Sequence, residues 1–141
     1  IGAYGAAAKG VVLLHFLRGA QKESRVDFIL DDAPLKQGTY CPGTDVPVRP
    51  TMWLRHRIRS SASKPIALLI LAWNFWEEIT HRLRALLGNE KDAVLCLLPF
   101  PEARVVSLRH GHTLVRNRFR PSPLPLAHMD AEPMRSHISS P

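Results

Sequence analysis

Four short segments of this 141-residue chain carry side chains of the kinds that bind ligands. The first segment, residues 2–10, reads GAYGAAAKG and is a glycine-punctuated turn that enters a helix. Small residues let a backbone approach an anion, a helix N-terminus offers amide donors, and Lys9 adds a positive charge. The turn lacks the GxGxxG spacing of dinucleotide-binding proteins, so a plain strand-to-helix turn is an equal alternative.

The other three segments each combine polar groups with a turn. Asp31 follows an apolar run, where an acidic side chain can accept ribose hydroxyls or simply cap a turn. Lys36, Gly43 and Thr44 lie in one loop and could clamp a phosphate or a sugar, although a rigid loop is an even alternative. Asn74 follows a second apolar run, and its amide either caps a helix or faces a ligand.

Cysteine and histidine spacing gives no sign of a metal site. Cys41 and Cys96 are too far apart for a metal-binding knuckle, and two cysteines are too few for a disulfide framework. Of the seven histidines, only His110 and His112 lie close together in the sequence, and no set of four Cys or His residues has zinc-ligand spacing. We therefore expect two reduced cysteines and no metal ligand in this chain.

The apolar pattern predicts the strands that must position these segments. Residues 1–6 form a short apolar opening, and residues 7–17 follow at helical spacing. Residues 26–30 and 93–98 read as two more short strands. The continuous apolar run at residues 66–73 is typical of a strand buried on both faces at the centre of a parallel sheet.

Two further helices are expected between these strands. Residues 51–60 predict a basic helix anchored by apolar side chains, and residues 34–50 hold too many prolines and glycines for a long helix. Asn74 and Glu77 have the spacing of a capping pair, and Gly88 is placed to end the helix that follows. Alternating strands and helices predict an α/β, Rossmann-like open sheet, mostly parallel, with helices on both faces. Ligands of such sheets collect at the carboxyl ends of the strands.

Composition changes near Val106. Residues 107–141 hold five of the twelve prolines and four of the seven histidines, with few apolar residues. Such a segment buries too little apolar surface to offset the entropy lost on ordering. We therefore expect a domain at residues 1–106 and, at residues 107–141, a basic tail rich in proline, serine and histidine that is disordered or artefactual.

Charge and hydropathy limit the function classes. No apolar run approaches the roughly 18 to 20 residues that span a bilayer, and no leader opens the chain, so we expect a cytoplasmic protein without a membrane partner. Because the first residue is Ile1, we expect a piece of a longer protein. The net charge of +7 would favour binding to the phosphates of a nucleic acid. However, Phe119 is the sole aromatic residue among the arginines of the tail, so the tail lacks the aromatic side chains on which single-stranded nucleic acids stack.

Five segments occur in the order seen in one known kind of domain. They are GAYGAAAKG at 2–10, DDAPLKQG at 31–38, PGTDVPV at 42–48, LAWNFWEEI at 71–79 and LPFPEARVV at 98–106. This set closely resembles the C-terminal domain of the S-adenosylmethionine-dependent sugar C-methyltransferases, which act on nucleotide-linked keto-deoxysugars. The resemblance spans residues 1–106. One departure is Ala33, where the family usually has a small polar residue.

The resemblance implies that substrate binding and catalysis are carried by different domains of the whole protein. Members of the family have an N-terminal zinc module, a central domain that binds S-adenosylmethionine and carries the acid and base groups, and this domain, which helps to hold the nucleotide sugar. The first two parts lie outside this chain, so we assign no catalytic residue and expect no methyl transfer by the chain alone. The substrate-binding candidates that the resemblance implies are Tyr4, Lys9, Asp31, Lys36, Gly43, Thr44 and Asn74.

Two alternatives remain. The same domain also occurs in methyltransferases that act on substrates other than sugars. From another class, the chain is a stand-alone nucleotide-binding protein or a basic nucleic-acid-binding protein.

Overall fold

The computed structural model describes residues 1–20, 26–60, 65–109 and 113–116. Its strands are β1 (Gly2–Tyr4), β2 (Phe28–Asp31), β3 (Val48–Pro50), β4 (Ile66–Ile70), β5 (Val94–Leu98), β6 (Arg104–Ser107) and β7 (Thr113–Arg116). Its helices are α1 (Ala8–Ala20), α2 (Trp53–Ser60) and α3 (Trp76–Leu87), with 3-10 turns η1 (Pro34–Lys36), η2 (Trp73–Phe75) and η3 (Gly88–Ala93).

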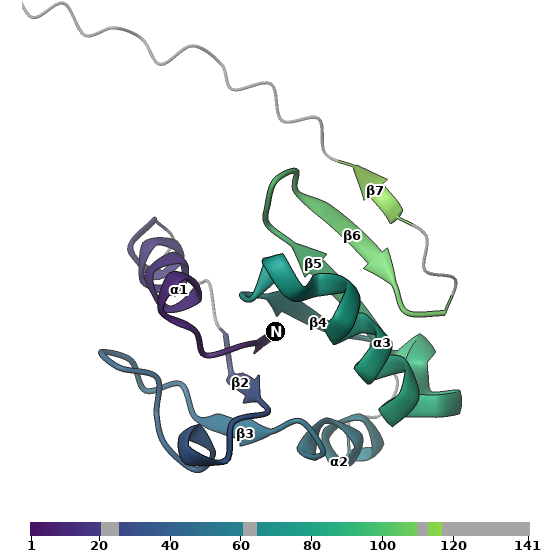
Figure 1. Cartoon of the computed structure of the whole chain (residues 1–141), viewed down its shortest axis with the longest axis horizontal. Coiled ribbons are helices and arrows are strands. Elements are labelled where there is room, and N and C mark those ends of the chain that lie inside the picture. The colour runs from purple at the N-terminus through teal and green to yellow at the C-terminus, as the bar shows by residue number, and fades with distance from the viewer. Residues whose placement is uncertain (21–25, 61–64, 110–112, 117–141) are drawn as a thin grey trace, which may run out of the picture.

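The described residues form one seven-stranded sheet in the order β3-β2-β1-β4-β5-β6-β7. Neighbouring strands from β3 to β5 run parallel, whereas β6 and β7 are added antiparallel. Helix α1 packs on one face, and α2 and α3 pack on the other (Figure 1). The predicted α/β, Rossmann-like and mostly parallel sheet is thus confirmed, and β4 lies at its centre as expected.

The two faces of β4 are buried unequally, which corrects one expectation. Leu68 and Ile70 point into the core beneath α2 and α3 and are fully buried. Ala67 and Leu69 point to the opposite face and are only partly buried. The described residues place the single helix α1 on that face, and one helix is too narrow to cover the whole sheet.

The core beneath α2 and α3 is formed by apolar side chains that recur at helical spacing along the helices and at every second residue along the strands. Leu54 is the buried anchor of α2, while Trp53 and Ile58 pack partly buried beside it, as predicted. On α3, Ile79, Leu83 and Leu87 lie on one buried face. Cys96 of β5 joins the same core as a free thiol, and burial raises the pKa of that thiol to about 12. Cys41 is also a buried free thiol.

The start and end of α3 test the predicted capping pair. The turn η2 lies between β4 and α3, so the N-cap position falls on Phe75 and no side chain caps the helix. The capping role predicted for Asn74 is therefore wrong, because the extra turn moves its exposed side chain away from the first amides of the helix. Gly88 ends α3 as predicted, with φ of 53° and its N–H donating to the Arg84 carbonyl.

Three strands were not expected from the sequence. Strand β3 falls inside the proline-rich loop and is short. Strand β6 runs across the expected domain boundary at Val106, and β7 extends the sheet further. Leu108, which lies beyond that boundary, is fully buried. The ordered domain therefore continues past residue 106, because β6 and β7 pair as a hairpin that the average composition of the segment hid. The remainder of the predicted tail, residues 117–141, lies outside the described residues.

Among the described residues, no helix combines the length and the apolar character that crossing a bilayer requires.

Candidate functional site

The turn between β1 and α1 lies where the strand order reverses. Strand β1 pairs with β2 on one side and with β4 on the other. At its carboxyl end, the Gly5 N–H donates to the Leu30 carbonyl at 2.8 Å, while the Tyr4 carbonyl accepts from the Leu71 N–H at 2.9 Å. The chain therefore leaves the sheet between two neighbours, at the kind of switch point where open α/β sheets bind ligands.

Gly5 allows this turn to pass close to the turn that follows β4. Its φ is +93°, a conformation that residues with a Cβ rarely adopt, and a Cβ built there would lie 2.7 Å from the Ala72 Cβ. Only a residue without a side chain lets the two turns approach so closely. The glycine predicted to shape this turn thus has a steric role.

Within the part of the chain that the structure describes, three pockets lie at the β1–α1 turn or at the start of α1. The first, which we call the polar pocket, has a volume of about 310 Å³ and is lined by Tyr4, Gly5, Ala7, Asp31, Asp32, Ala72, Phe75, Glu78, Ile79 and Arg82. The second, the apolar pocket, has a volume of about 790 Å³ and is lined by Lys9, Val12, Leu13, Phe16, Trp73, Asn74, Phe100 and Pro101. The third, the loop pocket, has a volume of about 460 Å³ and is lined by Ala6, Ala8, Val11, Leu35, Lys36, Thr39, Tyr40, Cys41, Pro42 and Val48.

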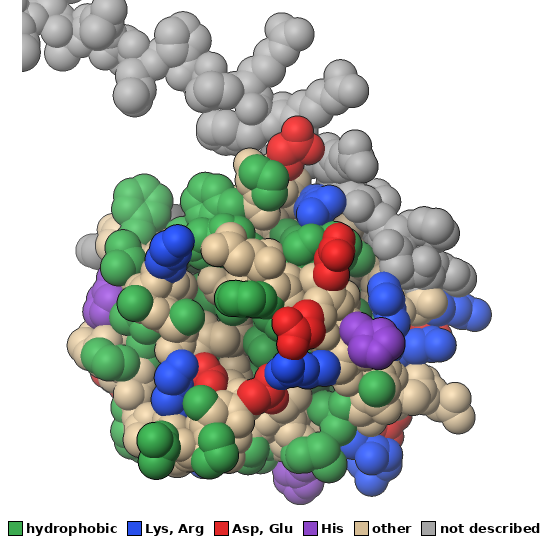
Figure 2. All heavy atoms as spheres, in the orientation of Figure 1, with side chains coloured by type: hydrophobic (Ala, Val, Ile, Leu, Met, Phe, Trp, Pro, Cys, Tyr) green, Lys and Arg blue, Asp and Glu red, His purple; other side chains and the backbone are tan. Residues whose placement is uncertain are grey.

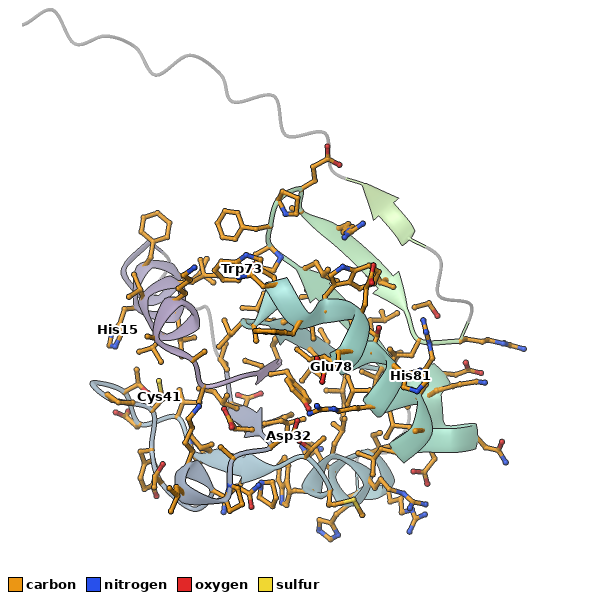
Figure 3. The ribbon with its side chains drawn as sticks, viewed as in Figure 1. His15, Asp32, Cys41, Trp73, Glu78 and His81 are labelled. Carbon is orange, nitrogen blue, oxygen red and sulfur yellow. The ribbon has the colours of Figure 1, made fainter. Side chains whose placement is uncertain are left out.

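Asp32 is the hub of the polar pocket. Its Oδ2 accepts from the Tyr4 hydroxyl at 2.6 Å and from Arg82 Nη1 at 2.8 Å. Its Oδ1 accepts from the Thr51 hydroxyl at 2.6 Å. Arg82 also donates through Nη2 to Glu78 one helical turn earlier. Figure 3 places Asp32 and Glu78 near the centre of the view, with α3 running past them. One connected set of polar groups is therefore formed by the end of β1, by the residues directly after β2 and β3, and by helix α3.

The charges of this network are fixed by its contacts. Burial alone would raise the pKa of Asp32, but hydrogen bonds from Thr51, Tyr4 and Arg82 outweigh burial and hold that pKa below its usual value. Burial, together with the hydrogen bond to Asp32, raises the pKa of Tyr4 to about 12. The hydrogen bond to Asp32 and the charge of Glu78 raise the pKa of Arg82. At neutral pH, Asp32 is thus a carboxylate, Arg82 a guanidinium and Tyr4 a neutral phenol.

Asp31 has a different set of partners from its neighbour. Its carboxylate is buried and accepts from the backbone N–H groups of Ala6 at 2.7 Å and Ala33 at 2.8 Å. Lys36 Nζ lies 3.2 Å from the same carboxylate and 3.0 Å from the Ala6 carbonyl. The structure thus brings Asp31 and Lys36 together as a clasp that fastens the β1–α1 turn to the loop after β2.

Gly43 and Thr44 lie in the loop that flanks α1. Gly43 has a φ of +69°, and a Cβ there would meet the His15 ring at 2.8 Å. The Thr44 hydroxyl donates to the Cys41 carbonyl at 2.9 Å and accepts from the Val46 N–H at 3.2 Å. Both residues shape this loop, and neither lines any of the three pockets described above.

The apolar pocket brings together two other predicted residues, Lys9 and Asn74. Between them, the ring centroids of Trp73 and Phe100 lie 5.0 Å apart. Phe16, on α1, is 70% exposed. Figure 2 shows hydrophobic side chains gathered over and beside α1 at the upper left, while acidic and basic side chains alternate at the centre. The pocket therefore offers aromatic surface with one cation and one amide at its rim.

The predicted residues thus divide among several places. Tyr4 and Asp31 line the polar pocket, Lys9 and Asn74 line the apolar pocket, and Lys36 lines the loop pocket. Sequence reasoning missed Asp32, Phe75, Glu78, Arg82, Trp73 and Phe100 as pocket residues. Two features of the sequence could have pointed to some of them: Asp32 is the second acidic residue of the DDAP segment, and Glu78 and Arg82 have the i, i+4 spacing of an ion pair on one helix face.

Among the described residues, no three His, Cys, Asp or Glu side chains come together in a group that could hold a metal ion.

Two comparisons with known proteins bear on this arrangement. The family model described as "C-methyltransferase C-terminal domain" matches residues 1–99. The C-methyltransferase NovU of Streptomyces niveus is 33% identical over 107 residues, which cover 76% of this chain. The matched region is 23% of the length of that relative, so this chain spans about a quarter of it.

Proposed function

The chain belongs to the C-methyltransferase C-terminal domain family, and from this membership we propose that it helps an S-adenosylmethionine-dependent C-methyltransferase to hold a nucleotide-linked keto-deoxysugar. In this proposal the chain binds and orients the substrate. S-adenosylmethionine, the catalytic base and a zinc module belong to parts of the protein outside this chain. Bound there, S-adenosylmethionine would supply a methyl group from its sulfonium and would leave as S-adenosylhomocysteine, and the base would take up the proton lost from the carbon beside the sugar ketone.

The apolar pocket carries this proposal. Its volume of about 790 Å³ falls within the range typical of small-molecule sites, and its lining is aromatic and aliphatic with a few polar groups. Trp73 and Phe100 offer ring faces on which a nucleobase can stack. Lys9, which lies in the first turn of α1, offers a cation for a diphosphate.

The location of the pocket also supports a substrate-holding role. It is lined by the start of α1, by the turn after β4 and by the loop after β5. All three segments follow the carboxyl ends of parallel strands, the edge of an open α/β sheet at which nucleotides bind. Figure 3 shows Trp73 beside α1 at this edge.

Calorimetric titration of the chain with thymidine diphosphate tests the proposal. We expect saturable binding that weakens on the order of tenfold in the variant Lys9→Ala, because a charge-assisted hydrogen bond to the phosphate is lost. Lys91→Ala is the matched control. Lys91 lies in η3, which precedes β5 and so sits at the opposite edge of the sheet. Absence of binding, or equal loss in the two variants, would contradict the proposal.

A second experiment tests whether methyl transfer requires parts of the protein outside this chain. The purified chain should not transfer a labelled methyl group from S-adenosylmethionine to any nucleotide sugar. Turnover by the chain alone would show that it contains a donor site and a base, and would overturn the assignment of these groups to other parts of the protein.

A further inference from the structure

The polar pocket and the apolar pocket are both lined by the turn after β4. Gly5 and Ala7 of the β1–α1 turn line the polar pocket, as do Ala72 and Phe75 of the β4–α3 turn. The intervening Trp73 and Asn74 line the apolar pocket instead. A ligand bound at the apolar pocket therefore lies one turn of chain away from a second, chemically distinct pocket.

The charges of the polar pocket disfavour a phosphate. Asp32 and Glu78 share the single guanidinium of Arg82, which leaves an excess of negative charge. Asp31 lines the pocket as well, but Lys36 and two backbone amides already engage it. An anionic group would face carboxylates here, whereas a neutral ligand with hydroxyl groups would meet acceptors and donors of both kinds.

Hydrogen-bonding capacity remains within the network. A carboxylate can accept about four hydrogen bonds, and three donors occupy Asp32. Glu78 is an exposed side chain whose Oε1 accepts from Arg82, and within the described part of the chain its Oε2 accepts no hydrogen bond. These oxygens therefore offer at least two positions for hydroxyl donors.

An aromatic ring completes the pocket. Phe75 lines the pocket and is 62% exposed, although Phe is an apolar residue that usually lies inside. Sugar rings carry hydroxyl groups around their edge and C–H groups on their faces. A ring face beside carboxylates and a guanidinium matches both features. The volume of about 310 Å³ is at the small end for ligand pockets and suits one ring rather than a whole nucleotide.

We propose that the polar pocket formed by Phe75, Glu78, Arg82, Asp32 and Tyr4 binds the hydroxyl groups of a sugar ring. The link to a nucleotide rests on the proposed function: the sugar is then either the ribose or the glycosyl group of the nucleotide sugar whose base and phosphates occupy the apolar pocket. Asp32, oriented by Tyr4 and Thr51, and Glu78, oriented by Arg82, accept from the hydroxyls, and Phe75 covers the ring face.

Chemical-shift mapping of the whole ¹⁵N-labelled chain tests the sugar site without any nucleotide. The probes are D-ribose and methyl β-D-glucopyranoside at millimolar concentration. We expect saturable shifts of the amide signals of Asp32, Phe75 and Glu78 with one of the two sugars. In Glu78→Gln the affinity should fall about tenfold, and in Phe75→Ala the shifts should vanish.

Glu77→Gln is the matched control, because Glu77 is the preceding exposed glutamate of α3 and does not line the pocket. Both glutamates are exposed, and an exposed i, i+4 ion pair adds little stability, so each variant should fold. Absence of shifts with both sugars would overturn the proposal. Unchanged shifts in Glu78→Gln and Phe75→Ala, or equal losses in Glu77→Gln, would do the same.

Nucleotide titrations identify the source of the sugar. If the glycosyl group binds here, thymidine diphosphate glucose should bind more tightly than thymidine diphosphate, and Glu78→Gln should remove that gain. If the ribose binds here, uridine diphosphate should show the corresponding gain over the deoxyribose nucleotide. Sugar shifts without any nucleotide binding would uphold the sugar site and contradict the proposed function alone.

Discussion

The polar and apolar pockets share the turn after β4, yet their side chains are held in different ways. In the polar pocket, Tyr4, Thr51 and Arg82 converge on Asp32, so the groups that would meet a ligand also hold one another. In the apolar pocket, Phe16 is 70% exposed, and Phe100 is 45% exposed and contacts the Trp73 ring. A change in the polar pocket should therefore alter both stability and binding, whereas a change in the apolar pocket should alter binding alone.

Among the residues that line the pockets, the largest effect on stability is expected at Gly5 of the polar pocket. Gly5→Ala places a Cβ 2.7 Å from the Ala72 Cβ and forces alanine to a φ of +93°. Strain and overpacking together should cost about 2 to 4 kcal/mol in the free energy of unfolding. Urea denaturation measures this loss, and both pockets should change with it.

Gly38→Ala is the control that separates the two costs of Gly5→Ala, the backbone strain at positive φ and the steric clash of the added Cβ. Gly38 has a φ of +80°, but a Cβ there would meet nothing within 4 Å. This variant should lose only about 1 kcal/mol, the cost of the left-handed conformation. Equal losses in the two glycine variants would show that the contact between the two turns contributes nothing.

A smaller effect is expected at the hub of the polar pocket. Asp32→Asn keeps the shape of the side chain but removes its charge, and should cost about 1 to 2 kcal/mol at pH 7 after allowance for its partial exposure. Because the folded-state pKa of Asp32 lies below its usual value, its contribution is present above about pH 4 and is lost as the pH falls further.

The difference in unfolding free energy between wild type and Asp32→Asn should therefore shrink below about pH 4. Denaturant titrations at pH 7, 5 and 3 measure it. A difference that stays constant over this range would mean that the charge of Asp32 does not stabilise the fold.

The smallest effect on stability is expected in the apolar pocket. Phe16→Ser should change the unfolding free energy by less than about 0.5 kcal/mol, because the ring is already 70% exposed. Leu14→Ala on the same helix, where the side chain is fully buried, should cost about 2 to 5 kcal/mol. A large loss in Phe16→Ser would remove the contrast between the two pockets.

Long apolar patterns in the sequence predicted most of the fold correctly. The run that forms β4 and the helical spacing of Leu83 and Leu87 carry their signal over many residues. Short elements carry little signal, and β3 consists of the three residues VRP within a loop rich in proline. The capping prediction for Asn74 failed because spacing alone cannot show that an extra turn precedes the helix.

The site was predicted less completely than the fold. The turn after β1 was correctly expected at the carboxyl edge, because glycine and alanine in that order mark a strand-to-helix connection. The hub was missed, since Asp31 and Asp32 are equivalent by type and only the direction of each side chain separates them. The pairing of Asp32 with Arg82 joins residues 50 positions apart, and no local pattern encodes such a contact.

The β1–α1 turn has a consequence for how the protein tolerates change. Its residues line different pockets: Gly5 and Ala7 line the polar pocket, and Ala6 lines the loop pocket. The first two residues of α1 continue this division, because Ala8 lines the loop pocket and Lys9 the apolar pocket. A larger side chain at one of these positions therefore enters a different pocket from a larger side chain at the next position. A substitution at residues 5–8 that improves one pocket for its ligand therefore risks altering a neighbouring pocket. Selection for a larger ligand in any of the three pockets should yield substitutions at the other lining residues rather than at residues 5–8.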